Sequence, residues 1–454
     1  MSLTIADSNT NTEIETLSLR LDDLLNTKVK GAQIRAKADF IELGEKSTKF
    51  FFKKEKINCD NKLIERLLIN GNEVTEPKKI LKELHNYFSK VFTSKLAAFN
   101  GDFDSIFLNN NIFMPKLDEE AKIALDVRLT LLELETAMKE MLFNKTPGSD
   151  GIPVEFYILF WEKIKYYLLD SINAALIKGS MSQTQKEGII NLLRKKDKDS
   201  LFLKNWRPLT MLNVDYKILA KTLANRIKTK ISTLIHSDQT GFLKNRYIGE
   251  NINRILSIME YCEKNDLEGL IVNIDFEKAF DSIEWNCLYK TLSFFNFGEN
   301  FIGYIKTLYN GSFAKVMNNG WASEPIQLGR GLRQGCPLSP YLFILVAELL
   351  SNNIRNNRNI KGICINNYEH KICQFADDTE NIISFDENSL REIMLTLDNF
   401  ESFSGLKVNS DKTEILKIGK SKFSNVEFLP QYKFKWKNNI KTLGVELWNE
   451  LSDT

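Results

Sequence analysis

The sequence predicts an α+β fold with two or three subdomains. The chain has 454 residues, 43% of them hydrophobic, so it can bury more than one core. Short apolar runs such as Leu270–Ile274 have the composition of buried strands, whereas longer segments repeat apolar residues at helical spacing. We therefore expect helices and strands within the same subdomains.

The first 60 residues predict an amphipathic helix, because leucines recur at three- and four-residue spacing from Leu17 to Leu25. This helix leads to a basic-aromatic patch, Lys49–Lys54, which suits either docking of phenylalanines onto a core or stacking on nucleic acid. A second helix is expected over Pro77–Phe92. The unpatterned stretch Ala97–Lys116 predicts a loop or linker.

The middle of the chain predicts helices, a charged hairpin and a rigid loop. The hairpin joins the strand Gly188–Leu193 to an extended Asn205–Thr210 through a basic tip, which is either solvated or a clamp on a triphosphate. The loop Lys145–Pro153 holds two prolines and two glycines, which fix an irregular backbone. Helices are expected over Leu129–Phe143, Val154–Leu169, Val214–Leu234 and Gly249–Glu263.

The C-terminal part predicts further hairpins and helices. A hairpin over Ala314–Leu328 is expected to turn at Asn318–Gly320. A glycine-flanked basic loop, Gly329–Pro340, opens a helix whose N-terminus carries partial positive charge. The remaining expected elements are helices over Tyr341–Asn352 and Ser389–Phe403 and strands over Tyr432–Lys437 and Lys441–Val445.

Two acidic segments end strand-forming runs. Asp275 follows Leu270–Ile274, and Asp377 and Asp378 follow Ile372–Phe375. Carboxylates beside a buried sheet are costly unless a positive charge compensates, and Mg²⁺ prefers such oxygen ligands. Two such ions support in-line attack at phosphorus. An Asp-Asp pair by itself is more often a solvated turn, so both interpretations stay open at this point.

Composition narrows the class of protein. A net charge of +2 gives no bulk signal for nucleic-acid binding, so a phosphate-binding surface must come from local clustering. Six cysteines without a Cys-x-x-Cys pair, and only three histidines, favour free thiols in a reducing compartment over structural zinc. The polar N-terminus does not resemble a signal peptide, and the longest apolar run, Tyr341–Ala347, is too short for a bilayer. We expect a soluble protein without a membrane partner.

Several short segments, taken in order, resemble the reverse transcriptase of LINE-type (non-LTR) retrotransposons. The resemblance covers about residues 130 to 445 and implies a right-hand polymerase with fingers, a palm with an antiparallel sheet, and a partial thumb. The implied domains are a helical N-terminal extension (1–125), fingers and palm (126–420) and a truncated thumb (421–454). The matching segments are Thr146–Ile152, Asn205–Leu209, Asp238–Phe242, Asp275–Asp281, Arg333–Pro340, Phe375–Asp378 and Leu443–Gly444.

The resemblance also implies roles for individual residues. Asp275, Asp377 and Asp378 are the implied catalytic residues and hold two Mg²⁺ ions, with Mn²⁺ as an alternative. The implied nucleotide-binding residues are Lys195, Arg207, Phe280, Gln334, Gly335 and Lys412. Arg333, Leu443 and Gly444 are implied to contact template or primer.

The resemblance implies a specific chemical role for Phe280 and for Lys412. The ring of Phe280 would clash with a ribose 2′-hydroxyl and so select deoxynucleotides, whereas viral RNA-copying RNA polymerases carry a polar residue there. Lys412 is implied to protonate the leaving pyrophosphate. Phe375 replaces the family's commoner tyrosine, a conservative change.

The implied function is RNA-directed DNA polymerisation, with template RNA, a DNA primer and deoxynucleoside triphosphates as partners. The expected location is cytoplasmic or nuclear, as a ribonucleoprotein. We expect no endonuclease domain in this chain. Two alternatives stay open: an inactive relic that binds RNA or protein, and a splicing cofactor like the group II intron maturases. The Asp238–Phe242 segment and the absence of a maturase domain favour the LINE-type interpretation.

Overall fold

The structure, a computed structural model, describes Thr16, Arg20 and residues 63–95, 114–196 and 198–449. The basic-aromatic patch Lys49–Lys54 and nearly all of the predicted N-terminal helix lie outside the described residues. The chain divides into two compact units. One comprises 1–84, 191–208 and 317–322, and the other comprises 85–190, 209–316 and 323–454. The domain boundaries implied at residues 125 and 420 stay a prediction.

The first unit contains two tight antiparallel hairpins. β1 (Leu67–Ile69) pairs with β2 (Asn72–Val74), and the end of β6 (Phe313–Asn318) pairs with β7 (Trp321–Ala322). The second turn has Asn319 and Gly320 at φ 50° and 78°, the conformation that a two-residue hairpin loop favours. This confirms the predicted hairpin. β3 (Glu187–Arg194), β4 (Trp206–Leu212) and β6 run on into the second unit, in a sheet of order β4-β3-β6-β7 with β8 (Ile326–Gln327) on β6.

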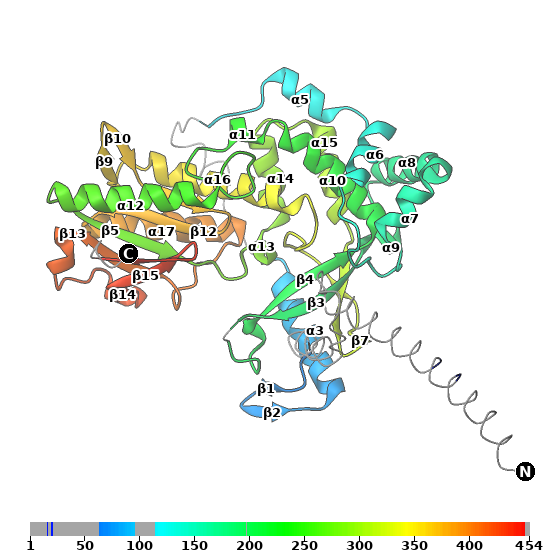
Figure 1. Cartoon of the computed structure of the whole chain (residues 1–454), viewed down its shortest axis with the longest axis horizontal. Coiled ribbons are helices and arrows are strands. Elements are labelled where there is room, and N and C mark those ends of the chain that lie inside the picture. Colours follow the sequence, from blue (N-terminus) through cyan, green and yellow to red (C-terminus); the bar gives the residue numbers. More distant parts are fainter. Residues whose placement is uncertain (1–15, 17–19, 21–62, 96–113, 197, 450–454) are drawn as a thin grey trace, which may run out of the picture. The chain divides into compact units, whose positions relative to one another are not determined.

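The second unit is organised around a five-stranded sheet of order β11-β12-β5-β13-β14 (Figure 1). Its neighbours are antiparallel except for the parallel pair β13 and β14. The strands are β5 (Glu268–Ile274), β11 (Ile372–Phe375), β12 (Asp378–Ser384), β13 (Glu414–Gly419) and β14 (Lys435–Lys437).

Both faces of this sheet are buried, which explains the continuous apolar run of β5. Ile271 packs in a cluster with residues of α12 (Ile248–Lys264), whereas Leu270 and Val272 belong to the large core with α16 (Ser339–Asn356) and α17 (Glu387–Ser404). Since alternate side chains of a strand point to opposite faces, an unbroken apolar sequence is required here. The mixed architecture confirms the predicted α+β class.

The described residues form further helices. Among the described residues, none combines the length and apolar character needed to cross a bilayer. They are α3 (Pro77–Phe92), α5 (Glu119–Asp126), α6 (Leu131–Lys139), α7 (Val154–Leu159), α8 (Trp161–Lys178), α9 (Gln183–Lys186), α10 (Val214–Lys228), α11 (Ile231–Leu234), α13 (Ala279–Ser282), α14 (Trp285–Phe294) and α15 (Glu299–Tyr309). The helix predicted over Val154–Leu169 is therefore two helices, α7 and α8.

The predicted last strand, Lys441–Val445, is wrong as a single element. The chain instead forms a hairpin of β15 (Asn439–Thr442) and β16 (Val445–Trp448), with Leu443 and Gly444 as its turn. Both turn residues have positive φ, 51° and 85°. Leucine adopts this conformation at a cost of about 1–2 kcal/mol, so Leu-Gly is not a turn signal that sequence patterns recognise.

Candidate active site

The two acidic segments lie on neighbouring strands. β12 pairs with β5, with Thr379 opposite Ile274. The same register, extended by one residue, brings the backbone of Asp275 opposite that of Asp378. Asp377 and Ala376 form the turn that joins β11 to β12, since Phe375 pairs with Asp378. The sheet therefore brings the three predicted acidic residues to one edge.

The carboxylate of Asp275 is held by two neighbours from the segment before β13. Lys412 Nζ lies 2.8 Å from Oδ2, and Asn409 Nδ2 donates to the same oxygen at 3.1 Å. The Asn409 backbone N–H also donates to the Asp275 carbonyl at 2.8 Å. Lys412 was predicted for the site, but Asn409 was not. A sequence pattern gives no sign of an amide that bonds a residue 134 positions away.

The donor chemistry of this edge suits a hard divalent cation. Carboxylate oxygens are the preferred protein ligands of Mg²⁺, and the ammonium of Lys412 lies where a cation would compensate Asp275. Within the described residues, no three His, Cys, Asp or Glu side chains gather as a preformed metal cage. Mg²⁺ characteristically uses only one or two carboxylates and takes other ligands from substrate phosphates, so a cage is not required.

Phe280 is fixed by two other aromatic rings. Its ring stacks on Phe343 of α16, with centroids 4.4 Å apart and an interplanar angle of 15°. Phe242 meets it edge-on at 6.3 Å. Phe280 lies five residues after Asp275 and remains partly exposed. The two ring contacts therefore fix the position of the Phe280 ring.

Gln334 and Gly335 lie against the end of β4. The Thr210 N–H donates to the Gln334 carbonyl at 2.7 Å, and Gly335 adopts φ 112°. A Cβ at Gly335 would come within 2.3 Å of the Thr210 carbonyl oxygen, so only glycine fits. Gln334 Nε2 donates to both carboxylate oxygens of Asp281 at 3.1 Å, which fixes the orientation of its amide. Asp281 is buried; it ends the matching segment Asp275–Asp281 but was not predicted as a site residue.

The C-terminal half of α3 packs against the loop that follows Asp275. Lys278 adopts φ 50°, and its Nζ lies 4.7 Å from the ring centre of Tyr87 and 4.9 Å from that of Phe88. Burial, together with the charges of Asp281 and Glu277, raises the pKa of Tyr87 to about 12. A segment that precedes all seven matching motifs therefore contacts the acidic loop, which sequence motifs could not show.

The predicted triphosphate contacts, Lys195 and Arg207, belong to the first unit. Lys195 Nζ donates to the Lys204 carbonyl at 3.0 Å, and the Lys195 N–H donates to the Asn205 carbonyl at 2.9 Å. The Arg207 side chain is exposed. Their contact with a nucleotide stays a prediction.

A family model described as "Reverse transcriptase (RNA-dependent DNA polymerase)" matches residues 193–447, more than half of the chain. The matched range includes Asp275, Asp377 and Asp378. The chain belongs to the reverse transcriptase family.

Relatives of this reverse transcriptase come from transposable elements. The "Transposon TX1 uncharacterized 149 kDa protein" of Xenopus laevis is 29% identical over 94% of this chain. The Pol polyprotein of type-2 retrotransposable element R2DM from Drosophila melanogaster is 31% identical over 46% of the chain, and the RNA-directed DNA polymerase of mobile element jockey from Drosophila funebris is 25% identical over 55%. These similarities confirm the predicted resemblance to LINE-type reverse transcriptases. The chain spans only 32%, 19% and 27% of the length of these curated relatives.

Of the residues implied to contact template or primer in this reverse transcriptase, Arg333 is buried. Its Nη2 donates to the Lys186 carbonyl at 2.7 Å, and its guanidinium lies 5.1 Å from the ring centre of Tyr216. Only 4% of Arg333 is exposed, and its contact with template or primer stays a prediction. Leu443 and Gly444 form the exposed end of the β15–β16 hairpin, where contact with a duplex stays a prediction.

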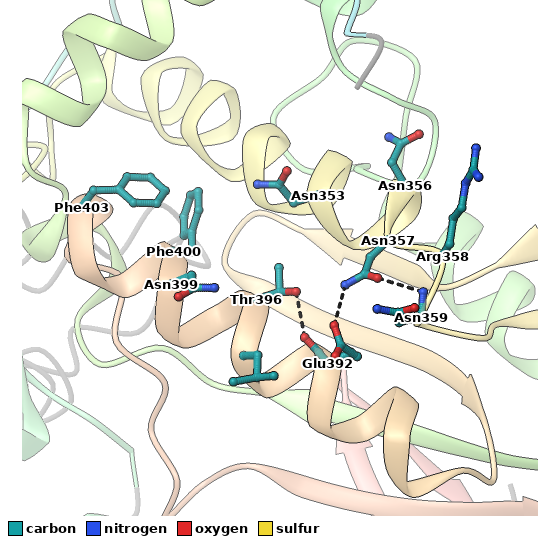
Figure 2. A pocket seen from close by; sticks show the side chains of 11 residues that line it. Asn353, Asn356, Asn357, Arg358, Asn359, Glu392, Thr396, Asn399, Phe400 and Phe403 are labelled. Carbon is teal, nitrogen blue, oxygen red and sulfur yellow. Dashed lines mark hydrogen bonds between the residues drawn. The ribbon is translucent and has the colours of Figure 1, made fainter. Parts of the chain in front are cut away.

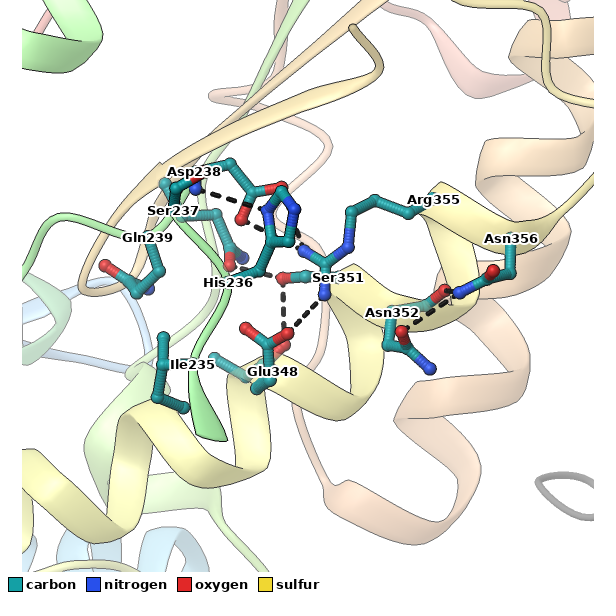
Figure 3. A network of polar contacts seen from close by, with 12 residues as sticks. Ile235, His236, Ser237, Asp238, Gln239, Glu348, Ser351, Asn352, Arg355 and Asn356 are labelled. Atoms are coloured by element: carbon teal, nitrogen blue, oxygen red, sulfur yellow. Dashed lines mark hydrogen bonds and ion pairs between the residues drawn. The ribbon is translucent and has the colours of Figure 1, made fainter. Parts of the chain in front are cut away.

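A buried ionic network joins α16 to the Asp238 segment of the reverse transcriptase (Figure 3). Arg355 of α16 donates to both carboxylate oxygens of Asp238 at 3.0 and 2.9 Å and also pairs with Glu348. His236 Nδ1 lies 3.0 Å from Asp238. Burial acts to raise the pKa of Asp238, but the contacts with His236 and Arg355 hold that pKa below its ordinary value. Burial raises the pKa of Glu348 to about 7, against the opposing charge of Arg355.

An open pocket of about 550 Å³ lies between the end of α16 and α17 (Figure 2). Its lining includes several side-chain amides, among them Asn353, Asn357 and Asn399, beside the rings of Phe400 and Phe403. None of the residues predicted to act in catalysis lines it. The pocket therefore shares no lining residue with the site of Asp275, Asp377 and Asp378.

Proposed function

We propose that the chain is an RNA-directed DNA polymerase of a LINE-type retroelement, which adds deoxynucleotides to a DNA primer on an RNA template by a two-metal mechanism. The observation that supports this most is the register that brings Asp275 opposite Asp378, beside the turn residue Asp377. The polymerase would have the right-hand arrangement of fingers, palm and partial thumb.

In this proposal the acidic edge binds the metal-chelated triphosphate. Asp275 and Asp377 would hold two Mg²⁺ ions with help from Asp378, and the bound ions would activate the primer 3′-hydroxyl and stabilise charge at the α-phosphorus. Asn409 orients the Asp275 carboxylate through the same oxygen that Lys412 contacts. Lys412, which pairs with Asp275 in the structure, would donate a proton to the leaving pyrophosphate.

The remaining site residues select and place the nucleotide. Phe280, held between Phe343 and Phe242, blocks the space of a ribose 2′-hydroxyl. Gln334 and Gly335 border the new base pair, with the amide of Gln334 oriented by Asp281. Lys195 and Arg207 grip the triphosphate, Arg207 through its planar guanidinium.

Primer extension on an RNA template tests this function. The protein should incorporate deoxynucleotides with Mg²⁺ or Mn²⁺, and Asp377→Ala should lower the rate by about 1,000-fold or more because a metal ligand is lost. If the unaltered protein binds RNA but does not extend a primer under any metal condition, the chain is an inactive relic and the proposal is wrong.

A further inference from the structure

Gln239 contacts the backbone of the catalytic turn. Its side chain is 1% exposed, and its Oε1 accepts the N–H of Ala376 at 2.9 Å. Its Nε2 donates to the carbonyl of the same residue at 3.3 Å. Both polar groups of Ala376, the residue directly before Asp377, are therefore bound by one side chain.

The orientation of this amide is unambiguous. Oε1 also accepts the Gly241 N–H at 2.8 Å, so the oxygen faces two donors and the nitrogen faces a carbonyl. Exchange of the two amide atoms would oppose donor to donor and acceptor to acceptor. The contact is therefore specific for glutamine.

The turn needs such support because its conformation is strained. Ala376 adopts φ 58°, which a residue with a Cβ occupies at a cost, and the residue is 5% exposed. Buried N–H and carbonyl groups without partners carry a further penalty. Gly241 comes so close that a Cβ there would lie 2.4 Å from the Ala376 nitrogen. No side chain at 241 can intervene between Gln239 and the turn.

Gln239 is itself anchored on both sides. The Thr240 N–H donates to the Gln374 carbonyl, and the Gln374 N–H donates to the Asp238 carbonyl, both at 2.9 Å. Arg246 Nη1 donates to the Gln239 carbonyl at 2.7 Å. The segment 238–240 therefore pairs in parallel with β11 at Gln374, the strand that leads into the turn.

We propose that Gln239 is a positioning residue of the polymerase, which holds the Ala376–Asp377 turn so that the Asp377 carboxylate reaches the nucleotide-bound metal. This inference rests on the proposed function. Loss of the two Gln239–Ala376 hydrogen bonds leaves the substrate-binding groups in place but shifts the Asp377 carboxylate. Misplacements of about 1 Å cost on the order of 100-fold in rate. The effect should therefore appear in kcat rather than in KM.

The test combines kinetics with hydrogen exchange on the full chain. Gln239→Met should lower kcat for deoxynucleotide addition by about 10- to 100-fold with KM changed less than about threefold. Exchange of the segment 372–378 should accelerate about tenfold or more, because the Ala376 N–H loses its acceptor. Gln239→Glu keeps the two acceptor bonds, and in its ionised form it turns an oxygen in place of the donor toward the Ala376 carbonyl, so its kcat should be intermediate.

Gln185→Met is the matched control. Gln185 is also buried, at 2% exposed, and its Oε1 accepts the Ser182 N–H at 3.1 Å, but it does not contact the turn. It should leave the exchange of 372–378 unchanged. The inference is wrong if Gln239→Met keeps kcat within twofold, or if its exchange matches that of the control. Should Gln239→Met fail to fold, an unchanged kcat of Gln239→Glu overturns the inference. If the unaltered protein does not polymerise, the proposed function fails while the exchange experiment still tests the Gln239–Ala376 hydrogen bonds.

Discussion

The two acidic segments are held in opposite ways. The turn before Asp377 is fixed by a buried side chain, Gln239, through uncharged bonds to backbone groups. The carboxylate of Asp275 is instead held by Lys412 and Asn409. The side chains of the ion pair, Lys412 and Asp275, are 49% and 38% exposed. Buried backbone contacts fix a position permanently, whereas exposed ionic contacts exchange readily with water and ligands. The site therefore joins a rigid backbone element to a carboxylate that is free to change partner.

The largest effect is expected from Phe280, whose ring is fixed by Phe343 and Phe242 five residues after Asp275. Phe280→Ala should raise the ratio of ribonucleotide to deoxynucleotide incorporation by about 100-fold, because the stacked ring no longer fills the space of the 2′-hydroxyl. Competition between the two nucleotide types in primer extension measures this ratio. Phe280→Tyr keeps the ring and should stay selective; an unchanged ratio in Phe280→Ala contradicts the gate.

A smaller effect is expected from Lys412, and it should show whether the Lys412–Asp275 pair serves the reaction or only the stability of the fold. Lys412→Met should lower kcat about tenfold through loss of the proton donor, while the free energy of unfolding changes by less than about 1 kcal/mol because the pair is exposed. Single-turnover rates and urea unfolding measure the two quantities.

Lys407→Met removes a comparable exposed pair with Glu277 and serves as the control. It should leave both quantities nearly unchanged. A loss of stability in Lys412→Met that accounts for the loss of rate would show that the lysine is structural.

The smallest effect concerns the buried network of Arg355, Asp238 and Glu348, and it should appear only in the free energy of unfolding. Because the pKa of Glu348 is raised to about 7 from its ordinary 4.5, the folded chain binds this proton more tightly than the unfolded chain. Its contribution is fully present below about pH 4.5 and is lost as the pH rises to about 7. Glu348→Gln should remove this decline, so the difference in unfolding free energy between variant and wild type should change by about 2 kcal/mol between pH 5 and 7.5. Urea unfolding across that range measures it, and parallel curves for the two proteins contradict it.

The sequence predicted elements whose pattern is local. The strand before Asp275, the helix Pro77–Phe92 and the Asn319–Gly320 turn follow from apolar period, capping or turn residues, and the structure has them. The α+β class was predicted correctly for the same reason. The Leu443–Gly444 turn was missed because a leucine with positive φ is held by its surroundings rather than by its own preference.

The site shows the same division between local and distant information. The aspartates end strands and are visible in the sequence. The contacts of Asn409 with Asp275, of Gln239 with Ala376 and of Asp281 with Gln334 act instead across long separations. The burial of Arg333 was not predicted, because a basic residue in a glycine-rich loop gives no sign that it packs on Tyr216. Contacts of this kind depend on the tertiary structure, which a pattern of residue types does not encode.

Single-turnover primer extension with Asp275→Asn, Asp377→Asn and the double variant tests most directly whether the two acidic segments serve one centre. Residues that act as a unit are strongly non-additive. Each single variant should lose about 1,000-fold or more, and the double variant should fall no further than the slower single variant. Either a single variant that keeps its rate within tenfold of wild type, or two losses that multiply in the double variant, would contradict a shared centre.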